Sequence, residues 1–446
     1  MTDQSLLDRL TDLVSRARRA GADGADALIS ESRGLEVAYR LGERETLERA
    51  ESTTLGLRVF VGDRQAAVST GDLSAKTLNQ LVARAVEMAK AAPPDPFSRL
   101  ATETELTANR PDLDLVDPDE PSPDRLSDLA KAAEAAARAV PGVVNSEGGD
   151  ASWSRSEIAL ATSNGFAGGY GRTSVSLSAT AIGERDGVME RDYDYAMGIG
   201  LSDLADPDTI GRTAGERAVR RLGARRVKSQ SAPVVFEQRL AASLLRSLAS
   251  ATNGSAIARG VSYLKDSLNE QIMPKGLTVR DDPQRLRGFA SKPFDAEGLA
   301  TASYDLVSDG VLQCWALDIR SATKLGLESN GRASRGVGSS PSPGSTNLDL
   351  LPGDASPEAL IAEIRDGLYV TELIGHGGDL ATGDYSRGAA GFWIENGEVA
   401  YPVNELTIAS NLKDMFLALT PANDLIRRGA VNAPTLRVDG MTIAGQ

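Results

Sequence analysis

Residues 93–124 form a stretch so rich in proline and aspartate that neither a helix nor a central strand can run through it. Proline lacks the backbone N–H that a helix or a sheet ladder needs, and its ring fixes φ. This composition is typical of an extended linker. We therefore expect an N-terminal α/β domain over 1–95, a Pro/Asp-rich linker over 96–123, a central α/β domain over 124–228 and a β-rich C-terminal domain over 229–446.

The same order of helices and strands occurs on both sides of this linker. Before it, apolar residues from Leu6 to Ala17 recur at helical spacing, residues 55–61 alternate as in a strand, and a second helix is expected over about 74–92. After it, helices are expected over about 124–139 and 207–222, with glycine-punctuated strands between them. This order predicts two N-terminal helix–sheet–helix units.

The last part of the chain is expected to be rich in strands and to carry a few helices. An alanine- and leucine-rich segment, 239–252, predicts a helix. Asp309–Gly310 and Asn396–Gly397 stand between strand-like runs, a pattern typical of tight β-hairpins. The stretch 330–345 is rich in Gly, Ser and Pro and is expected to be a flexible loop. Together with the N-terminal units, these features predict an α+β (mixed α/β) fold.

Charge and hydropathy exclude several classes of protein. The formal net charge is -14, and no basic stripe is interleaved with aromatic residues, so nucleic acid is not an expected partner. The first residues carry charges every few positions, unlike a signal peptide. No stretch approaches the roughly 18 apolar residues that span a bilayer. A single cysteine excludes an internal disulfide. We therefore expect a soluble, cytoplasmic chain without a membrane partner.

Four aspartates in the linker resemble a calcium-binding loop at first sight. They are Asp112, Asp114, Asp117 and Asp119. The segment lacks both the turn glycine and the distant glutamate of an EF-hand loop. A solvated acidic connector is the favoured interpretation.

The chain has one histidine, His376, and one cysteine, Cys314, which leaves few options for catalysis. Zinc sites generally need several His or Cys ligands, so a zinc site in this chain is not expected. A Ser-His-Asp arrangement would need His376 as its base, with Ser386 and Asp384 nearby, but the chain contains no G-x-S-x-G elbow. The favoured interpretations are a glycine-rich turn at His376 and a small core residue at Cys314. Phosphate-binding glycine motifs are also absent from the sequence.

The segment 382–398, "TGDYSRGAAGFWIENGE", is the best candidate for a binding site. Arg387 can clamp a carboxylate, while Tyr385 and Trp393 can line a groove. A strand edge there can also accept a peptide by strand addition. The alternative is an ordinary turn with a buried tryptophan. The candidate residues for binding a peptide or a partner are Asp384, Tyr385, Ser386, Arg387 and Trp393.

Several long strings resemble the TldD/PmbA family, and within it the PmbA (TldE) branch. The longest is "VTELIG…TGDYSRGAAGFWIENGEVAYPVNELTIASNLKDM" at 370–415, and similar stretches occupy 51–70, 254–272 and 291–313. This resemblance implies a subunit that pairs with a TldD-like metalloprotease subunit in a heterodimeric zinc metalloprotease. It also implies cleavage of unfolded or small peptides, including microcin maturation. An older description of the family is modulator of DNA gyrase.

The resemblance places the catalytic metal in the partner. In TldD, an H-E-x-x-x-H helix follows a strand that resembles residues 232–236 here, and a later cysteine completes the zinc site. This chain has "EQRLAASLLRSLASAT" at 237–252, without a histidine, and no cysteine after Cys314. We therefore expect no cofactor in this chain, zinc in the TldD-like partner, and no catalytic site of its own.

Two other functions remain open from the sequence alone. One is a non-proteolytic binding or scaffold protein, homodimeric when alone and gyrase-modulator-like. The other is an independent hydrolase that uses His376. Whether the chain is an enzyme without its partner is therefore left open.

Overall fold

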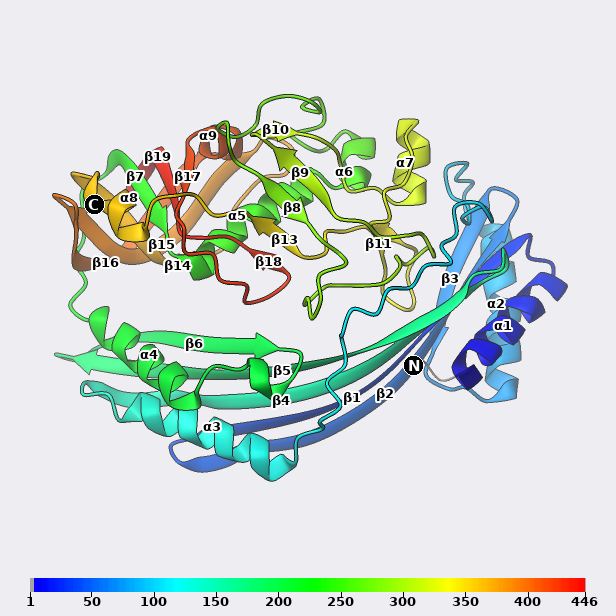
Figure 1. The fold of residues 1–446 in the computed structure, drawn as a ribbon, viewed down its shortest axis with the longest axis horizontal. Coiled ribbons are helices and arrows are strands. Elements are labelled where there is room, and N and C mark those ends of the chain that lie inside the picture. Colours follow the sequence, from blue (N-terminus) through cyan, green and yellow to red (C-terminus); the bar gives the residue numbers. More distant parts are fainter. Residues whose placement is uncertain (1–3, 446) are drawn as a thin grey trace.

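The computed structural model describes residues 4–445 and consists of a long curved sheet with a β-rich body lying along one of its faces (Figure 1). The sheet has the strand order β3-β2-β1-β4-β5-β6, and each neighbouring pair is antiparallel. Its strands are β1 (Gly24–Arg40), β2 (Glu43–Val61), β3 (Arg64–Thr70), β4 (Val143–Thr162), β5 (Ala167–Arg185) and β6 (Val188–Gly198).

Strands from both sides of the Pro/Asp-rich segment join in this one sheet. β1 pairs with β4 from Asp26 opposite Thr162 to Tyr39 opposite Gly149. The central strands have 17 to 20 residues, far longer than the usual five or six. The two expected helix–sheet units therefore share a continuous ladder of hydrogen bonds.

Two helices pack at each end of the sheet, and each pair builds its own core (Figure 1). These helices are α1 (Gln4–Arg19), α2 (Ala75–Ala91), α3 (Pro123–Arg138) and α4 (Pro207–Arg220), with a 3-10 turn, η1 (Leu201–Asp203), before α4. The apolar stripe from Leu6 to Ala17 faces the first core, as its spacing predicted. Ser74 and Ser122 cap α2 and α3 by accepting hydrogen bonds from backbone N–H groups. Among residues 4–445, no helix is long and apolar enough to cross a membrane.

The Pro/Asp-rich segment is anchored to both parts of the molecule. Leu113 and Leu115 are buried, and their carbonyl groups accept hydrogen bonds from the backbone N–H groups of Arg287 and Thr173 at 2.9 and 2.8 Å. Arg287 belongs to the C-terminal body and Thr173 to β5. The segment therefore joins the body to the sheet as well as connecting α2 to α3.

The protein's own donors satisfy the aspartates of this segment. The Arg287 guanidinium lies 3.2 Å from the Asp114 carboxylate and 3.7 Å from that of Asp117. Asp112 accepts a hydrogen bond from the backbone N–H of Asp114, and Asp117 accepts one from that of Asp119. Within the described residues, no group of three or more His, Cys, Asp and Glu side chains is arranged to hold a metal ion.

The C-terminal body contains a six-stranded sheet, a five-stranded sheet and one large hydrophobic core. The six-stranded sheet has the order β16-β15-β14-β7-β19-β17, and β7 and β14 are parallel. Its strands are β7 (Gln230–Phe236), β14 (Asp366–Ile374), β15 (Asp384–Glu395), β16 (Glu398–Asn411), β17 (Leu419–Pro421) and β19 (Leu436–Ala444). The five-stranded sheet contains β8 (Val279–Asp281), β9 (Tyr304–Ser308), β10 (Val311–Leu312), β13 (Leu348–Leu350) and β18 (Val431–Asn432).

Short helices and one small hairpin complete the body. The helices are α5 (Gln238–Ala251), α6 (Gly254–Arg259), α7 (Ile319–Leu325), α8 (Pro357–Ala362) and α9 (Leu412–Leu417). The stretch 330–345, expected as a loop, contains the paired strands β11 (Ala333–Ser334) and β12 (Ser342–Pro343). Both expected tight hairpins are present, since Asp309–Gly310 and Asn396–Gly397 adopt positive φ between paired strands. The predicted α+β fold class, with N-terminal helix–sheet units and a β-rich C-terminal part, is confirmed.

The body approaches the sheet closely at Gly56 of β2. A Cβ atom at this position would lie 1.7 Å from the carbonyl oxygen of Val337, a backbone atom that cannot rotate away. We expect Gly56→Ala to lower the free energy of unfolding by about 1–3 kcal/mol, as overpacking does. Chemical denaturation measures this change. Gly34→Ala in β1 is the control, because its Cβ would meet Trp153 only at 3.5 Å; an equal loss in both variants would contradict the close approach.

Candidate functional site

The predicted binding segment 382–398 lies inside the C-terminal sheet. β15 pairs with β14 on one side and with β16 on the other. Residues 384–387 pair with β16, and on their other side Ser386 N–H donates to the Gly377 carbonyl group at 3.0 Å. Strand addition at this segment, one of the two modes expected from the sequence, is therefore a wrong prediction, because both edges of the strand are already occupied.

Two of the five predicted residues are part of the core. Tyr385 and Trp393 are 3% and 4% exposed and belong to the main hydrophobic cluster of the body. Burial raises the pKa of Tyr385 to about 12, and its hydroxyl group has no hydrogen-bond partner among the described residues. Alternation of apolar and polar residues cannot tell a groove wall from a core, which is why the sequence left both interpretations open.

The other three predicted residues are accessible to different degrees. Asp384 and Ser386 are exposed, and the Asp384 carboxylate accepts hydrogen bonds from Thr382 and Asn411 at 2.9 and 3.2 Å. Arg387 is half-buried, and its Nη2 donates to the Leu373 carbonyl group at 3.4 Å. A role of these residues in binding a peptide or a partner stays a prediction.

His376 and Cys314 show no sign of catalytic geometry. His376 is exposed in the bend that follows β14, and within residues 4–445 its imidazole makes no hydrogen bond or ion pair, so it contacts neither Ser386 nor Asp384 in that way. Cys314 packs partly buried against the main core. Burial raises the pKa of its thiol to about 11, which disfavours the nucleophilic thiolate.

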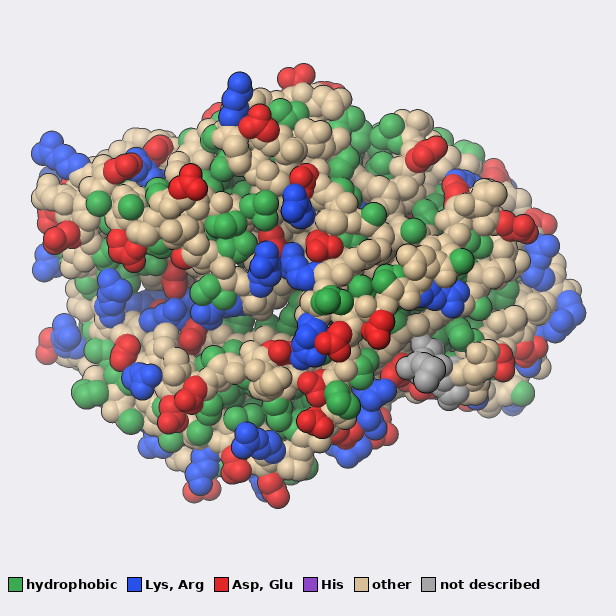
Figure 2. Space-filling model, viewed as in Figure 1, with side chains coloured by type: hydrophobic (Ala, Val, Ile, Leu, Met, Phe, Trp, Pro, Cys, Tyr) green, Lys and Arg blue, Asp and Glu red, His purple; other side chains and the backbone are tan. Residues whose placement is uncertain are grey.

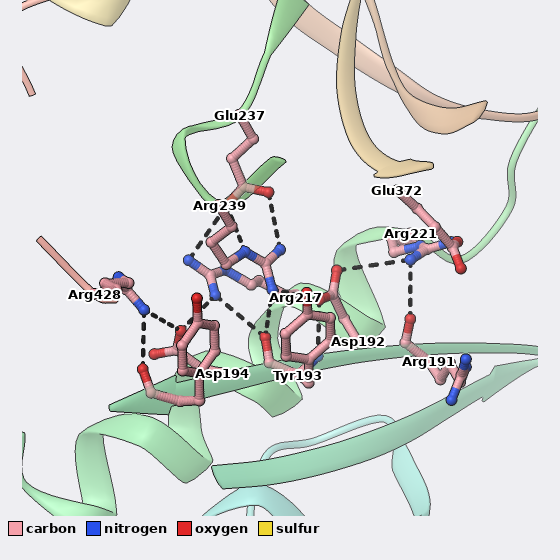
Figure 3. Close-up of polar contacts among 11 residues, drawn as sticks. Arg191, Asp192, Tyr193, Asp194, Arg217, Arg221, Glu237, Arg239, Glu372 and Arg428 are labelled. Atoms are coloured by element: carbon pink, nitrogen blue, oxygen red, sulfur yellow. Dashed lines mark hydrogen bonds and ion pairs between the residues drawn. The ribbon is translucent and has the colours of Figure 1, made fainter. Parts of the chain in front are cut away.

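A charged cluster that sequence reasoning did not find lies where β6, α4, α5 and β14 meet (Figure 3). We call it the arginine network. Its cations are Arg217, Arg221, Arg239 and Arg428. Its anions are Glu190, Asp192, Asp194, Glu237 and Glu372. The network joins the edge strand of the long sheet to the C-terminal body.

Arg239, the second residue of α5, is the most buried cation of the network, with a side chain 2% exposed. Its Nε and Nη2 donate to the two carboxylate oxygens of Glu237 at 3.0 and 2.9 Å. Its Nη1 donates to Asp192 at 3.0 Å and to the Tyr193 carbonyl group at 2.6 Å. Burial by itself would lower the pKa of Arg239, but its hydrogen bonds with Glu237 and the nearby charges raise it above the usual value.

The remaining cations share the same carboxylates. Asp194 lies 2.9 Å from Arg217 and 3.0 Å from Arg428, and Arg217 also reaches Glu237 at 3.4 Å. Arg221 pairs with Glu372 of β14. Buried ion pairs of this kind are favourable only when hydrogen bonds satisfy the desolvated groups, as they do here.

A cavity of about 230 Å³ opens beside the network and is cationic. Arg239, Arg246 and Arg428 line it together with Tyr195 and Phe289, and none of its described lining residues is acidic. Arg246 is exposed and makes no ion pair within the part of the chain that the structure describes. Figure 2 shows Lys and Arg side chains gathered along the hollow between the sheet and the body. A guanidinium group that has no ion pair with the described residues and lies beside apolar rings, as Arg246 does here, can bind a carboxylate.

The donors at this junction do not fit zinc. β7 leads into α5 at the place where the family resemblance puts the metal-binding helix of TldD, but α5 contains no histidine. Glu237, at its N-terminus, is already bound by Arg239 and Arg217. Zinc sites take thiolate, imidazole and carboxylate ligands, and here only carboxylates occur, each opposite a guanidinium.

The signals that could have revealed the network were present but not local. Asp192 and Asp194 are two residues apart on β6 and so lie on one face of the sheet. Arg217 is on α4, and Arg221, four residues later, is the C-cap of that helix. Arg428 joins Asp194 across 234 positions, a pairing that only the tertiary structure reveals.

Comparison with known proteins identifies matches along almost the whole chain. Three domain models of the PmbA/TldA metallopeptidases match: domain 1 over 25–89, the central domain over 116–222 and the C-terminal domain over 229–445. Metalloprotease PmbA of Escherichia coli O157:H7 is 40% identical over 99% of this chain and 97% of its own length. The metalloprotease PmbA homolog of Haemophilus influenzae is 33% identical over the same shares.

Solved structures share the fold. A proposed modulator of DNA gyrase from Bacteroides thetaiotaomicron is 28% identical, with a TM-score of 0.91 over 98% of each chain. TldE from Thermococcus kodakarensis has a TM-score of 0.86 over 98% of this chain and 100% of its own, at 21% identity. At that identity the second likeness concerns the fold alone.

Proposed function

Because the chain belongs to the PmbA/TldD metallopeptidase family and so has a peptidase-related role, we propose that it is the peptide-holding subunit of a cytoplasmic heterodimeric metalloprotease. In this proposal a TldD-like partner carries the zinc and cleaves unfolded or small peptides. This chain contributes binding and no metal ligand.

The observation that carries the proposal is the junction between β7 and α5. Arg239 at the start of α5 pairs with both Glu237 and Asp192 of β6, so it connects the helix to the long sheet. A residue that is fully engaged in buried ion pairs is not free to ligate a metal or to accept a proton from water. This supports a division of labour in which the partner performs the bond cleavage.

Peptide binding is supported by the cavity beside the same junction. Arg246 and Arg428 face a space lined by Tyr195 and Phe289, which suits an anionic group carried by an apolar or extended peptide. The accessible residues of the predicted segment, Asp384, Ser386 and Arg387, are proposed as a second contact with peptide or partner. Tyr385 and Trp393 would support that contact from inside the core.

Zinc content and peptide cleavage, measured for the chain alone, for a TldD-like subunit alone and for the mixture, test the proposal. After dialysis we expect far less than one zinc per chain, no cleavage of an unfolded peptide by the chain alone, and faster cleavage by the mixture. One tightly bound zinc per chain together with cleavage by the chain alone would contradict the proposal.

Measurements on the same mixture distinguish the proposed protease subunit from a second candidate function. A solved relative with 28% identity is a proposed modulator of DNA gyrase, a description that names no protease. A stable homodimer that neither binds the TldD-like subunit nor changes its cleavage rate would favour the binding or scaffold protein. Light scattering gives the oligomeric state in each case.

A further inference from the structure

A second cavity, of about 180 Å³, lies between the long sheet and the C-terminal body and is separate from the arginine network. One wall is apolar and is formed by Leu28, Ile158 and Leu160 of the sheet, with Phe294 and Val337 of the body opposite. Since a water molecule occupies about 30 Å³, the space suits a ligand of roughly six or seven non-hydrogen atoms.

The other wall contains a guanidinium group that is buried but only partly hydrogen-bonded. The Arg335 side chain is 2% exposed, and its Nη1 donates to Asp26 at 2.5 Å. Its Nε is buried without an acceptor among the described residues. Within residues 4–445 the hydrogen bond of this side chain comes from Nη1, and none is formed by Nη2. The Asp26 carboxylate does not accept hydrogen bonds from these N–H groups, because it is also paired with Arg58. A buried donor without an acceptor is costly, so this edge of Arg335 favours an anion.

The charges that line the cavity have a positive excess. Lys292 lines it beside Arg335, and its Nζ donates to the Ala333 carbonyl group at 2.8 Å. Burial lowers the pKa of Lys292, the direction that a bound anion would oppose. The acidic lining residue, Asp295, already accepts three backbone hydrogen bonds at 2.9 to 3.1 Å, from Glu297, Leu299 and Ala333. Within residues 4–445 its carboxylate accepts no hydrogen bond from Arg335 or Lys292, although its charge acts on the Lys292 ammonium group.

We propose that this cavity binds a small carboxylate that carries a short apolar chain. The carboxylate accepts hydrogen bonds from the Nε and Nη2 edge of Arg335, the paired geometry in which guanidinium groups hold carboxylates, and lies near the Lys292 ammonium group. The alkyl part packs on Leu28, Ile158 and Phe294. Such a group can come from a free branched short-chain acid or from the C-terminal residue of a peptide.

Calorimetric titration with isovalerate tests the site, with isovaleramide as its uncharged counterpart. We expect saturable binding of isovalerate, one per chain, and at least tenfold weaker binding of the amide. Equal binding of both ligands, or no saturable binding of isovalerate, would overturn the proposal. A tripeptide ending in valine, compared with the same peptide amidated at its C-terminus, distinguishes the two sources of the carboxylate.

Two variants test whether isovalerate binds in this cavity. Arg335→Lys keeps the charge but removes the paired N–H edge, and should weaken isovalerate binding at least tenfold. Ala296→Leu adds bulk to a lining residue without changing any charge, and should abolish binding even if Arg335→Lys fails to fold. Arg365→Met is the control, because the Arg365 side chain is 89% exposed and lines neither cavity, and it should bind isovalerate as the natural chain does. Undiminished binding in Ala296→Leu would show that the ligand sits elsewhere.

Discussion

Arg239→Met is expected to lower the free energy of unfolding by about 3–5 kcal/mol, because it removes the closest counter-charge from two buried carboxylates. Glu237 and Asp192, 11% and 3% exposed at their side chains, both lose hydrogen bonds from the guanidinium group. Methionine replaces most of the volume of the arginine side chain. The lost free energy of unfolding therefore reflects charge and hydrogen bonding more than packing. Chemical denaturation measures the change.

Arg246→Met provides the matched control for this prediction. Arg246 is on the same helix, is exposed and has no ion pair among the described residues, so its replacement should change stability by less than about 0.5 kcal/mol. Similar losses in the two variants would mean that the network does not stabilise the contact between sheet and body.

Arg332→Met is expected to have an effect of similar size, about 3–5 kcal/mol, in the C-terminal body. Arg332 is fully buried, and its Nε donates to Asp281 of β8 at 2.9 Å. Its guanidinium carbon also lies 4.1 Å from the ring centre of Tyr304, a cation–π contact. Asp281 also accepts a hydrogen bond from the backbone N–H of Thr346. Asp281 therefore contacts residues at both ends of the 330–345 segment, and the loss of its ion pair with Arg332 should loosen both ends.

Arg280→Met is the control for Arg332→Met, because Arg280 directly precedes Asp281 in β8. Arg280 pairs with Asp305 at 2.7 Å, but its side chain is 46% exposed, and exposed pairs contribute about 0–1 kcal/mol. A melting temperature lowered equally by both substitutions would refute the distinction. Protease sensitivity confined to 330–345 in Arg332→Met would support the local loosening.

Local features of the sequence predicted most of the secondary structure. The spacing of Leu6 to Ala17 predicted α1, and the Asp309–Gly310 and Asn396–Gly397 pairs predicted hairpins that the structure contains. These features act through neighbours within a few residues, namely the helical period and the positive φ of tight turns. The segment 330–345 was expected to be a flexible loop, although Arg332 within it is fully buried, because composition does not reveal a distant partner such as Asp281.

The candidate site was predicted less well than the fold. Tyr385 and Trp393 stand in a segment that the sequence correctly related to the family, yet both side chains are buried in the core. The arginine network and the cavity lined by Arg335 and Lys292 were not predicted at all. Each depends on side chains that are brought together from several strands, helices and loops, as Arg335 and Asp26 are across 309 positions.

The sequence by itself determined the helical and hairpin segments and the family. It also determined that the chain has one histidine and one cysteine as possible zinc ligands of these types. These depend on residue types and short-range spacing, which folding cannot alter. The tertiary structure alone decided which carboxylate meets which guanidinium, since the energy of an ion pair depends on distance and burial. Arg246 and Arg239 are one residue type on one helix, yet one is exposed without a described ion pair and the other is enclosed between Glu237 and Asp192.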